Sequence, residues 1–436
     1  MSSPRLKFGI IGAGVTGLSA AYDLLQAGHE VTLFEAADHT GGLAAGFRDE
    51  TWQWSLEKFY HHLFTSDKAI VGLVKELGIG DNLFFPRPIT SVIHDGKIVP
   101  FDSPMAWIRF PGFNLLDVAR FGLVSAYLRF SNPWRSLEKY TADEWLRRWY
   151  GDKIYETTWR PLLIGKFGPY FEEANMAWMW ARLKVRSPRL GYFRGGFQMF
   201  IDSLTTSITK QGARIQLNSP IKAIMPVAEG RFSLDTNSEL ELFDRVLVTT
   251  SPELLRRMAP GLPPGYLGQL AELKSMGAVV LTLALREQLM PDTYWLNIPA
   301  RSPDKSQNDF PFLALVEHTN YVDRVHYGGD HIIYCGDYVV PDHDYLTMSK
   351  DEIEARFVSS LRQINPAFRP DWVRKSWLFR ARYAQPVPEV NHSRNIPDLR
   401  TPLPNLYFAS MSQVYPWDRG TNFAVKIGRE VATLMK

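Results

Sequence analysis

The stretch KFGIIGAGVTGLSAAYDLLQAGHEVTLFEA, residues 7–36, decides the fold. The apolar run Lys7–Ile11 predicts a strand, the spacing of apolar residues over Leu18–Ala27 predicts a helix, and Val31–Phe34 predicts a second strand. Three glycines in the pattern G-x-G-x-x-G separate the first strand from the helix. The order strand, glycine turn, helix, strand predicts an α/β fold that begins with a Rossmann-like unit.

The glycine turn and the acid after the second strand predict a dinucleotide site. Gly12 allows the tight turn, Gly14 lets the backbone approach a pyrophosphate, and Gly17 packs the helix against the strand. The helix N-terminus offers free N–H groups to phosphate. Glu35 follows Gly17 by 18 residues, close to the ~20 expected of an acid that accepts from a ribose hydroxyl. The predicted contacts of this segment are Gly12, Gly14, Val15, Thr16, Gly17, Glu35 and Ala36.

A second glycine motif, Gly41-Gly42, follows six residues after the acid, in FEAADHTGGLAAGF, residues 34–47. Glycine pairs let the main chain approach a ligand where a Cβ would collide, and their free N–H groups can face an anion. A flavin dinucleotide extends beyond its adenosine half, so a second region of bare backbone suits it. We therefore expect Gly41, Gly42 and Leu43 to contact that second half.

Taken together, the G-x-G-x-x-G turn, the acid and the glycine pair resemble the N-terminal signature of the flavin amine oxidase superfamily. This superfamily includes protoporphyrinogen oxidases, phytoene desaturases, amine oxidases and UDP-galactopyranose mutases. Many members carry Arg directly after the glycine pair, where this chain has Leu43. The resemblance implies FAD as the cofactor, with further contacts from later segments at Ile221, Thr250, Asp418, Gly420, Thr421 and Asn422.

The resemblance also implies the domain organisation. The FAD-binding domain would be a discontinuous, Rossmann-like α/β domain made of residues 1–75, 191–270 and 386–436. Residues 76–190 and 271–385 would form a second, mixed-sheet α+β substrate domain, and the first of these segments would carry a helical insertion.

One segment of that insertion, FNLLDVARFGLVSAYLRF at residues 113–130, has two interpretations. It is helical in pattern and mostly apolar, with a few charged residues interrupting it. Such a helix can be buried in a core or lie on a membrane surface. The core is the favoured interpretation.

Candidate catalytic residues are few, because a flavin supplies its own redox chemistry. No Ser/His/Asp grouping and no metal-ligand spacing stands out in the sequence, so we expect no metal. In related flavoproteins the segment that matches WSLEKFYHHLF, residues 54–64, passes near the flavin ring. A Lys or His there could stabilise negative charge on the flavin, which makes Lys58 and His61 candidates; packing or solvation is the alternative.

Two further candidates come from later strand-like segments. In VEHTN, residues 316–320, strand alternation would place Glu317 and Thr319 on one face and His318 and Asn320 on the other. One face could line a substrate cavity, which makes His318 a candidate, and a solvated strand face is the alternative. WLFRARYAQPVP resembles the family strand that crosses beside the flavin, which makes Tyr383 a candidate.

Composition bounds the other possibilities. Apolar residues make up 45% of the 436 residues and charged residues 22%, so a large core is available. A net charge of only +3 gives no argument for nucleic-acid binding, and we expect no nucleic-acid partner. A single cysteine excludes disulfides within the chain. The sequence contains no stretch of ~18 uncharged apolar residues, so we expect no helix that spans a membrane. We expect a cytoplasmic location that allows peripheral membrane contact.

The sequence thus predicts an FAD-dependent oxidoreductase, either an oxidase or a dehydrogenase. Its reaction would remove a hydride from a C–C or C–N bond of a small, largely apolar substrate. The alternative is a non-redox flavin enzyme of the UDP-galactopyranose mutase type, acting on a nucleotide sugar. A flavin-binding assembly partner without turnover is a third interpretation.

Overall fold

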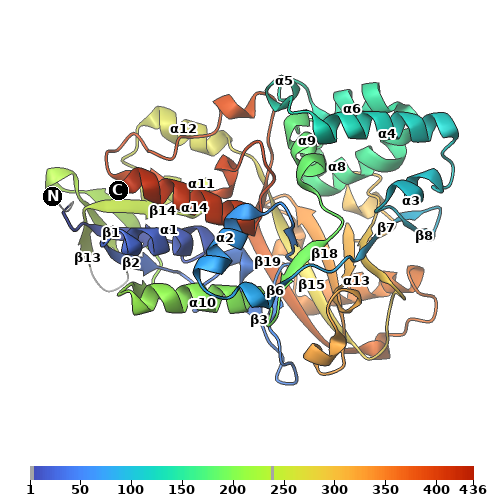
Figure 1. Ribbon diagram of the computed structural model, residues 1–436, viewed down its shortest axis with the longest axis horizontal. Coiled ribbons are helices and arrows are strands. Elements are labelled where there is room, and N and C mark those ends of the chain that lie inside the picture. The colour runs from blue at the N-terminus through green and yellow to red at the C-terminus, as the bar shows by residue number, and fades with distance from the viewer. Residues whose placement is uncertain (1–3, 237–239) are drawn as a thin grey trace.

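A computed structural model describes residues 4–236 and 240–436. Two sheets organise the chain (Figure 1): a small parallel sheet lies among helices at one end, and a larger mixed sheet lies at the other. A group of helices, drawn in teal and green, covers one side of the larger sheet.

The parallel sheet has five strands contributed by distant parts of the chain. Its neighbouring strands are all parallel. In spatial order the strands are β10 (Arg214–Gln216), β2 (Glu30–Phe34), β1 (Lys7–Ile11), β14 (Arg245–Val248) and β20 (Leu406–Phe408). The discontinuous Rossmann-like sheet that the sequence predicts is therefore confirmed.

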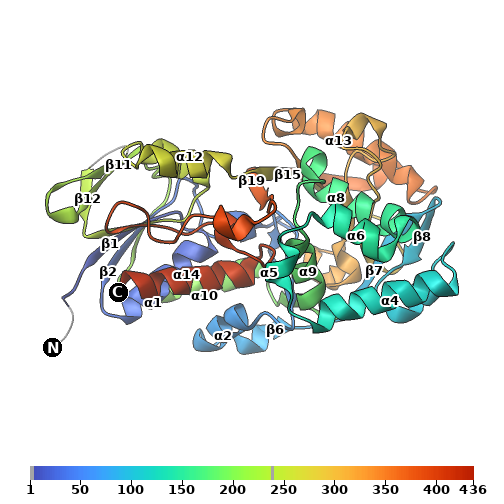
Figure 2. The same ribbon diagram turned by 90° about the horizontal axis from the view of Figure 1, so that it is seen from above.

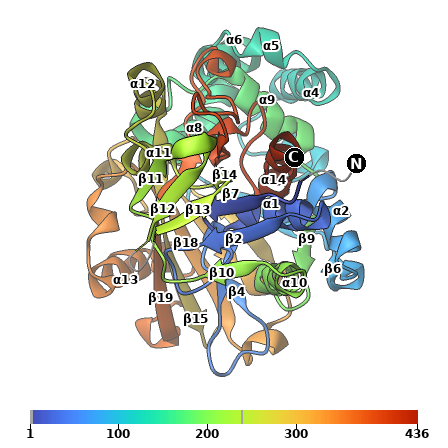
Figure 3. The same cartoon turned by 90° about the vertical axis from the view of Figure 1, so that its left-hand side faces the viewer.

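Both faces of this sheet are covered, which explains why its strands are continuous apolar runs. Phe8 and Ile10 of β1 pack against a layer of helices, whereas Ile11 and Phe34 pack on the opposite side. The first layer contains α1 (Val15–Gln26), α10 (Phe197–Lys210) and α14 (Thr421–Met435). The second contains β11 (Ala223–Pro226), β12 (Phe232–Asp235), β13 (Leu240–Phe243), α11 (Pro252–Met258) and α12 (Pro264–Glu272). Figure 3 shows the two layers on either side of β1 and β2.

The first helix begins earlier than predicted. Helix α1 starts at Val15 rather than at Leu18, because Gly14 already acts as its N-cap in extended backbone geometry. The helix ends at Gln26, and Gly28 follows with a φ of +87°, a left-handed conformation that suits glycine. The glycine turn and the first helical turn are therefore continuous.

The larger sheet has seven strands and is mixed. Its order is β19 (Val373–Pro386), β15 (Ser275–Leu285), β18 (His331–Val339), β17 (Ala314–Glu317), β16 (Thr293–Asn297), β7 (Ile89–His94) and β8 (Lys97–Pro100). Only the pair β16–β7 is parallel. Helix α13 (Lys350–Ser359) covers one face, and Tyr334, Gly336 and Tyr338 of β18 belong to the other by alternation.

Short elements connect the two sheets. Helix α2 (Lys68–Glu76) lies beside α14, and three short strands form a separate small sheet near it. Those strands are β5 (Leu63–Phe64), β9 (Leu190–Phe193) and β6 (Leu83–Phe84). A two-stranded ribbon of β3 (Gly46–Phe47) and β4 (Leu56–Glu57) leads from the glycine pair toward the larger sheet.

The helical insertion follows β8. Its helices are α3 (Pro104–Ile108), α4 (Leu115–Phe130), α5 (Trp134–Leu137), α6 (Ala142–Tyr150), α7 (Asp152–Ile154), α8 (Arg160–Phe167) and α9 (Met176–Val185). The favoured burial of residues 113–130 is wrong. Only Phe121 and Leu128 of α4 are buried, because the helix packs on its neighbours along one side and leaves the other side exposed.

Among the described residues, no helix has both the length and the apolar character needed to cross a membrane. In the same ranges, His, Cys, Asp and Glu side chains form no group of three or more that could hold a metal ion.

Candidate flavin and substrate site

The G-x-G-x-x-G turn leaves its backbone bare at the carboxyl end of β1. Gly12 has a φ of +103°, and a Cβ there would lie 2.5 Å from the Thr249 Oγ1 atom. A Cβ on Gly17 would lie 2.1 Å from the carbonyl oxygen of Gly12. Because no described side chain caps the N-terminus of α1, the N–H groups of its first turn remain available to an anion.

The second glycine motif lies directly against the first. The Gly41 N–H donates to the Ala13 carbonyl at 2.8 Å, and Gly14 and Gly41 form a parallel bridge. Gly41 and Gly42 both have positive φ values, +111° and +58°. A Cβ on Gly42 would lie 3.2 Å from the Gly14 Cα atom. Two segments that are 27 positions apart in sequence therefore form one surface without side chains.

Glu35 is held at the same place. One carboxylate oxygen accepts from the Ala13 N–H at 2.8 Å, and the other accepts from the Ala37 N–H at 2.9 Å. These bonds fix the carboxylate at the edge of the glycine turn, the position at which an acid receives a ribose hydroxyl in dinucleotide-binding folds. Ala36 links Glu35 to Ala37, whose N–H donates to the Glu35 carboxylate.

The later segments converge on this region. Thr250 follows β14 at the carboxyl end of the parallel sheet, and Ile221 packs with Ile11 and Phe34. Helix α14 crosses α1 so closely that a Cβ on Gly428 would lie 2.4 Å from the carbonyl oxygen of Thr16. No described side chain caps the N-terminus of α14 at Gly420 and Thr421.

Two of the predicted contacts have other partners as well. The Asn422 side-chain oxygen accepts from the N–H groups of Ala69 and Ile70, and so caps α2. Asp418 accepts from Trp178 Nε1 at 3.0 Å and pairs with Arg182 at 2.5 Å. Burial disfavours the charged form of Asp418, yet the nearby Arg182 and Lys166 lower its pKa overall.

This surface fits FAD. A dinucleotide pyrophosphate needs bare backbone and free N–H groups, and Gly12, Gly14 and Gly42 supply the bare backbone next to the first turn of α1. Glu35 offers the carboxylate for the ribose. The N-terminus of α14 lies on the same side of the sheet, since α14 and α1 pack together (Figures 1 and 3).

Lys58 and His61 lie on the segment that runs from the glycine pair to the larger sheet. The Lys58 N–H donates to the Ala45 carbonyl, and its Nζ atom lies 2.8 Å from His39 Nε2. Burial lowers the pKa of Lys58. His61 donates from Nδ1 to the Phe59 carbonyl at 2.5 Å, and burial lowers its pKa to about 4, so that it is neutral at pH 7.

Tyr60 anchors this segment on the larger sheet. A Cβ on Gly336 would lie 2.5 Å from the Tyr60 ring, so the ring occupies the space left by a missing side chain. The ring also meets Trp295 edge to face at 4.9 Å and Tyr334 at 5.8 Å. Aromatic side chains thus line the seam between the two sheets.

The strand interpretation of residues 316–320 is wrong. Strand β17 ends at Glu317, and a 3-10 turn over His318–Asn320 follows, so alternating faces do not apply beyond Glu317. Glu317 is buried and accepts from the Leu289 and Met290 N–H groups. His318 lies 2.8 Å from the Tyr327 hydroxyl, and burial lowers its pKa to about 3.

His318 belongs to a buried group that the sequence did not assign. Glu57 accepts from the Phe197 N–H at 2.7 Å and from the Tyr192 hydroxyl, which lies 3.4 Å from the Tyr327 hydroxyl. Burial raises the pKa of Glu57 to about 7, although the bonds from Phe197 and Tyr192 oppose this shift. We call this group the Glu57 network; its members are Glu57, Tyr192, Tyr327, Tyr334 and His318.

Tyr383 lies in a different part of the seam. Its hydroxyl accepts from the Ser412 N–H at 2.9 Å and lies 2.7 Å from Ser412 Oγ. Burial raises its pKa, so the phenol stays protonated. Ser412 also lines a small cavity together with Trp178, Gln385, Asp418 and Arg419. Tyr383 and Asp418 are therefore brought to one place, whereas Lys58 and His318 lie in other surroundings.

Three cations beside this small cavity form a cluster that sequence reasoning missed. Lys166 Nζ lies 4.3 Å from the centre of the Tyr338 ring, and Arg419 lies over the same ring and donates to its hydroxyl. Burial, Arg182 and Arg419 lower the pKa of Lys166 well below its usual value. The Arg419 Nε atom is buried without a partner in the described part of the chain. We call Lys166, Arg182 and Arg419 the cationic cluster.

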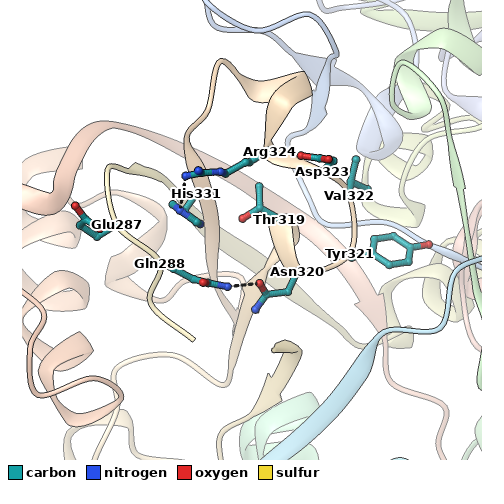
Figure 4. A pocket seen from close by; sticks show the side chains of 9 residues that line it. All are labelled: Glu287, Gln288, Thr319, Asn320, Tyr321, Val322, Asp323, Arg324 and His331. Carbon is teal, nitrogen blue, oxygen red and sulfur yellow. Dashed lines mark hydrogen bonds between the residues drawn. The ribbon is translucent and has the colours of Figure 1, made fainter. Parts of the chain in front are cut away.

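A larger, open pocket of about 630 Å³ lies elsewhere, around the 3-10 turn that follows β17 (Figure 4). Gln288 donates to Asn320 at 2.7 Å across it, and Arg324 lies 3.0 Å from His331. Its lining residues are Glu287, Gln288, Thr319, Asn320, Tyr321, Val322, Asp323, Arg324 and His331. None of these residues belongs to the glycine motifs or to the cationic cluster.

Known proteins resemble this chain over nearly its whole length. The family model for flavin containing amine oxidoreductase matches residues 15–435. A putative protoporphyrinogen oxidase from Exiguobacterium sp. 255-15 is similar in structure, with a TM-score of 0.77, 18% identity, and coverage of 100% of this chain and 99% of that one. A reduced UDP-galactopyranose mutase gives a TM-score of 0.75 at 17% identity over 98% and 95%.

Among curated proteins, zeta-carotene desaturase of Zea mays is 30% identical over 128 residues, 27% of this chain. The matched stretch spans 22% of the length of the maize enzyme. The shared stretch is thus a fraction of that enzyme, whereas the family model extends from the first turn of α1 to the last turn of α14. The chain belongs to the flavin-containing amine oxidoreductase family, whose members are FAD-dependent oxidoreductases.

Proposed function

We propose that this protein is an FAD-dependent oxidoreductase that removes a hydride from a C–C or C–N bond of a largely apolar small molecule. The observation that carries the proposal is the bare backbone surface of Gly12, Gly14 and Gly42 beside the uncapped start of α1. When bound, FAD accepts the hydride. We retain the division into residues 1–75, 191–270 and 386–436 for FAD and 76–190 and 271–385 for substrate as part of this proposal.

The residues of the chain would hold and orient the reactants. Glu35, the glycine motifs and the start of α14 would hold the dinucleotide. Lys58 and His61, on the segment that leaves the glycine pair, would face the flavin; Tyr383 and His318 remain the other proposed catalytic residues. The aromatic packing of Tyr60 against Trp295 and Tyr334 keeps water away from this seam. Burial keeps His61 and Tyr383 neutral at pH 7.

The test begins with the purified protein. We expect flavin absorption bands in the visible range, and release of FAD when the protein is unfolded. Anaerobic titration with polyenes, porphyrinogens and amines should then bleach the oxidised flavin for one substrate class. A folded protein that is colourless and does not bind added FAD would overturn the proposal.

A specific observation favours a second function. In the cationic cluster, Lys166 lies close enough to Arg182 and Arg419 for both to lower its pKa, and Asp418 pairs with Arg182. Arg side chains bind phosphate groups well. This arrangement supports a non-redox enzyme that acts on a nucleotide sugar. A UDP-galactopyranose mutase has a similar fold. Such an enzyme would need prior reduction of its flavin and would consume no electron acceptor, and an oxidoreductase would show the opposite behaviour.

A further inference from the structure

An exposed apolar surface covers the outer side of α4. Figure 2 shows α4 along the outer edge of the helical insertion, away from both sheets. The exposed fractions are large, 83% for Leu115, 79% for Leu116, 74% for Leu123, 51% for Tyr127 and 82% for Phe130. We call these five residues the α4 face.

The α4 face is continuous. At 3.6 residues per turn, its five residues fall within an arc of about 120°. Ala119 and Ala126 are exposed in the same arc, and the arc holds no charged residue. The opposite side of the helix is buried at Phe121 and Leu128. The helix is therefore apolar on both sides, whereas a surface helix of a soluble protein normally presents polar residues to water.

The exposed charges on the stretch of chain that carries α4 are of one sign. Between residues 101 and 140, the exposed charged side chains are all basic: Arg109, Arg120, Arg135 and Lys139. The acids of this stretch are engaged or less exposed. Asp117 pairs with Lys153 at 2.6 Å, and the buried Glu138 accepts from Ser393 at 2.9 Å.

We propose that the α4 face docks on the surface of an anionic lipid bilayer. Its Leu and Phe side chains would enter the interfacial layer, and the basic side chains beside it would meet acidic headgroups. A second copy of this chain is a poorer occupant, because a two-fold contact would place the same basic residues opposite one another. The partner is a lipid surface rather than a protein.

Docking would also position the candidate site. Arg129 of α4 donates to the Leu183 carbonyl of α9 at 3.1 Å, so the docking helix is tied to the helix that carries Arg182. The α4 face thus belongs to the same packed insertion as Lys166 and Arg182 of the cationic cluster. The docking proposal rests on exposure and charge alone and does not depend on the proposed oxidoreductase activity.

Co-sedimentation of the purified full chain with vesicles tests the proposal. We expect the protein to sediment with vesicles of phosphatidylcholine and phosphatidylserine, and more weakly with phosphatidylcholine alone. The triple variant Leu116→Asp, Leu123→Asp, Phe130→Asp should reduce partitioning at least about tenfold. The matched control is Leu254→Asp, at a leucine of α11 that is 45% exposed; it should partition as the wild type does.

Two further variants keep the test decisive. The single variant Leu123→Gln should weaken partitioning with unchanged thermal unfolding, which separates docking from misfolding. The double variant Arg109→Gln, Lys139→Gln should weaken binding to the vesicles that contain phosphatidylserine and leave binding to phosphatidylcholine vesicles unchanged. Absence of wild-type binding to both vesicle types would overturn the proposal, as would equal binding by wild type and triple variant. A dimer in solution that the triple variant abolishes, without vesicle binding, would identify the face as a self-association surface instead.

Discussion

The Glu57 network and the cationic cluster are both polar groups at the seam between the two sheets, yet they are built differently. Each side chain of the Glu57 network bonds to another member or to the backbone, and its carboxylate has no cation among these partners. The cationic cluster gathers three basic side chains, of which Arg182 pairs with Asp418, and Arg419 Nε has no partner in the described residues. A polar group satisfied internally braces the fold, whereas one with surplus charge and a free donor has capacity for a ligand.

Removing the carboxylate of the Glu57 network is expected to have the largest effect. In Glu57→Ala the Phe197 N–H and the Tyr192 hydroxyl both lose a buried partner, and each unpaired donor costs about 1–3 kcal/mol. The free energy of unfolding should fall by about 3 kcal/mol or more in urea titrations at about pH 5, below the raised pKa of Glu57. The exposed Glu50 offers the control Glu50→Ala, which should change it by less than about 0.5 kcal/mol. If the free energy of unfolding changed by a similar, small amount in both variants, the Glu57 network would not stabilise the fold.

The same carboxyl predicts a pH dependence of stability. Burial raises the pKa of Glu57 from 4.5 to about 7, so the folded state retains a proton that the unfolded state releases. The stabilising contribution is full below pH 4.5 and is lost as pH rises through about 7. Relative to Glu57→Gln, the wild-type free energy of unfolding should therefore fall by about 3 kcal/mol over this range. Parallel pH profiles for the two proteins would contradict the raised pKa.

Substitutions in the cationic cluster should affect binding rather than stability. With inorganic pyrophosphate as the probe and flavin absorbance as the readout, Lys166→Met should weaken binding about tenfold to hundredfold, since a hydrogen bond to a charged group contributes about 1.5–3 kcal/mol. Its stability should be unchanged or higher, because a desolvated cation among like charges is removed. The exposed Lys210 gives the control Lys210→Met. If Lys166→Met lost stability while its pyrophosphate binding was unchanged, the cationic cluster would support the fold and not the binding of a ligand.

The predictable features of this fold are local in sequence. The strand, glycine turn and acid between residues 7 and 36 act within one supersecondary unit, so their spacing alone places Glu35 at the turn. The β7–β8 hairpin follows from its Asp95-Gly96 turn, where both residues have positive φ. The Gly41-Gly42 pair is predictable as well, because it follows Glu35 closely in sequence and its bare backbone can approach a bound dinucleotide.

The remaining features depend on contacts that no local pattern records. Lys166, Arg182 and Arg419 come from α8, α9 and the segment before α14, and only the folded chain brings them together. Alternation failed beyond Glu317 because the chain turns there so that His318 can reach Tyr327. For α4, burial in the core is the favoured one of two interpretations because apolar content normally indicates burial. The sequence pattern does not show that only one side of the helix has a partner.

The FAD affinity of Gly14→Val tests whether bare backbone at the two glycine motifs binds FAD. Gly14 has a φ of −71°, and a Cβ there would come no closer than 3.9 Å to the protein, so the variant should fold normally. Its FAD dissociation constant should rise at least about 100-fold, or about 3 kcal/mol, while Gly265→Val, at an open position on α12, keeps wild-type affinity. Wild-type FAD binding by folded Gly14→Val would show that FAD does not bind against this bare backbone.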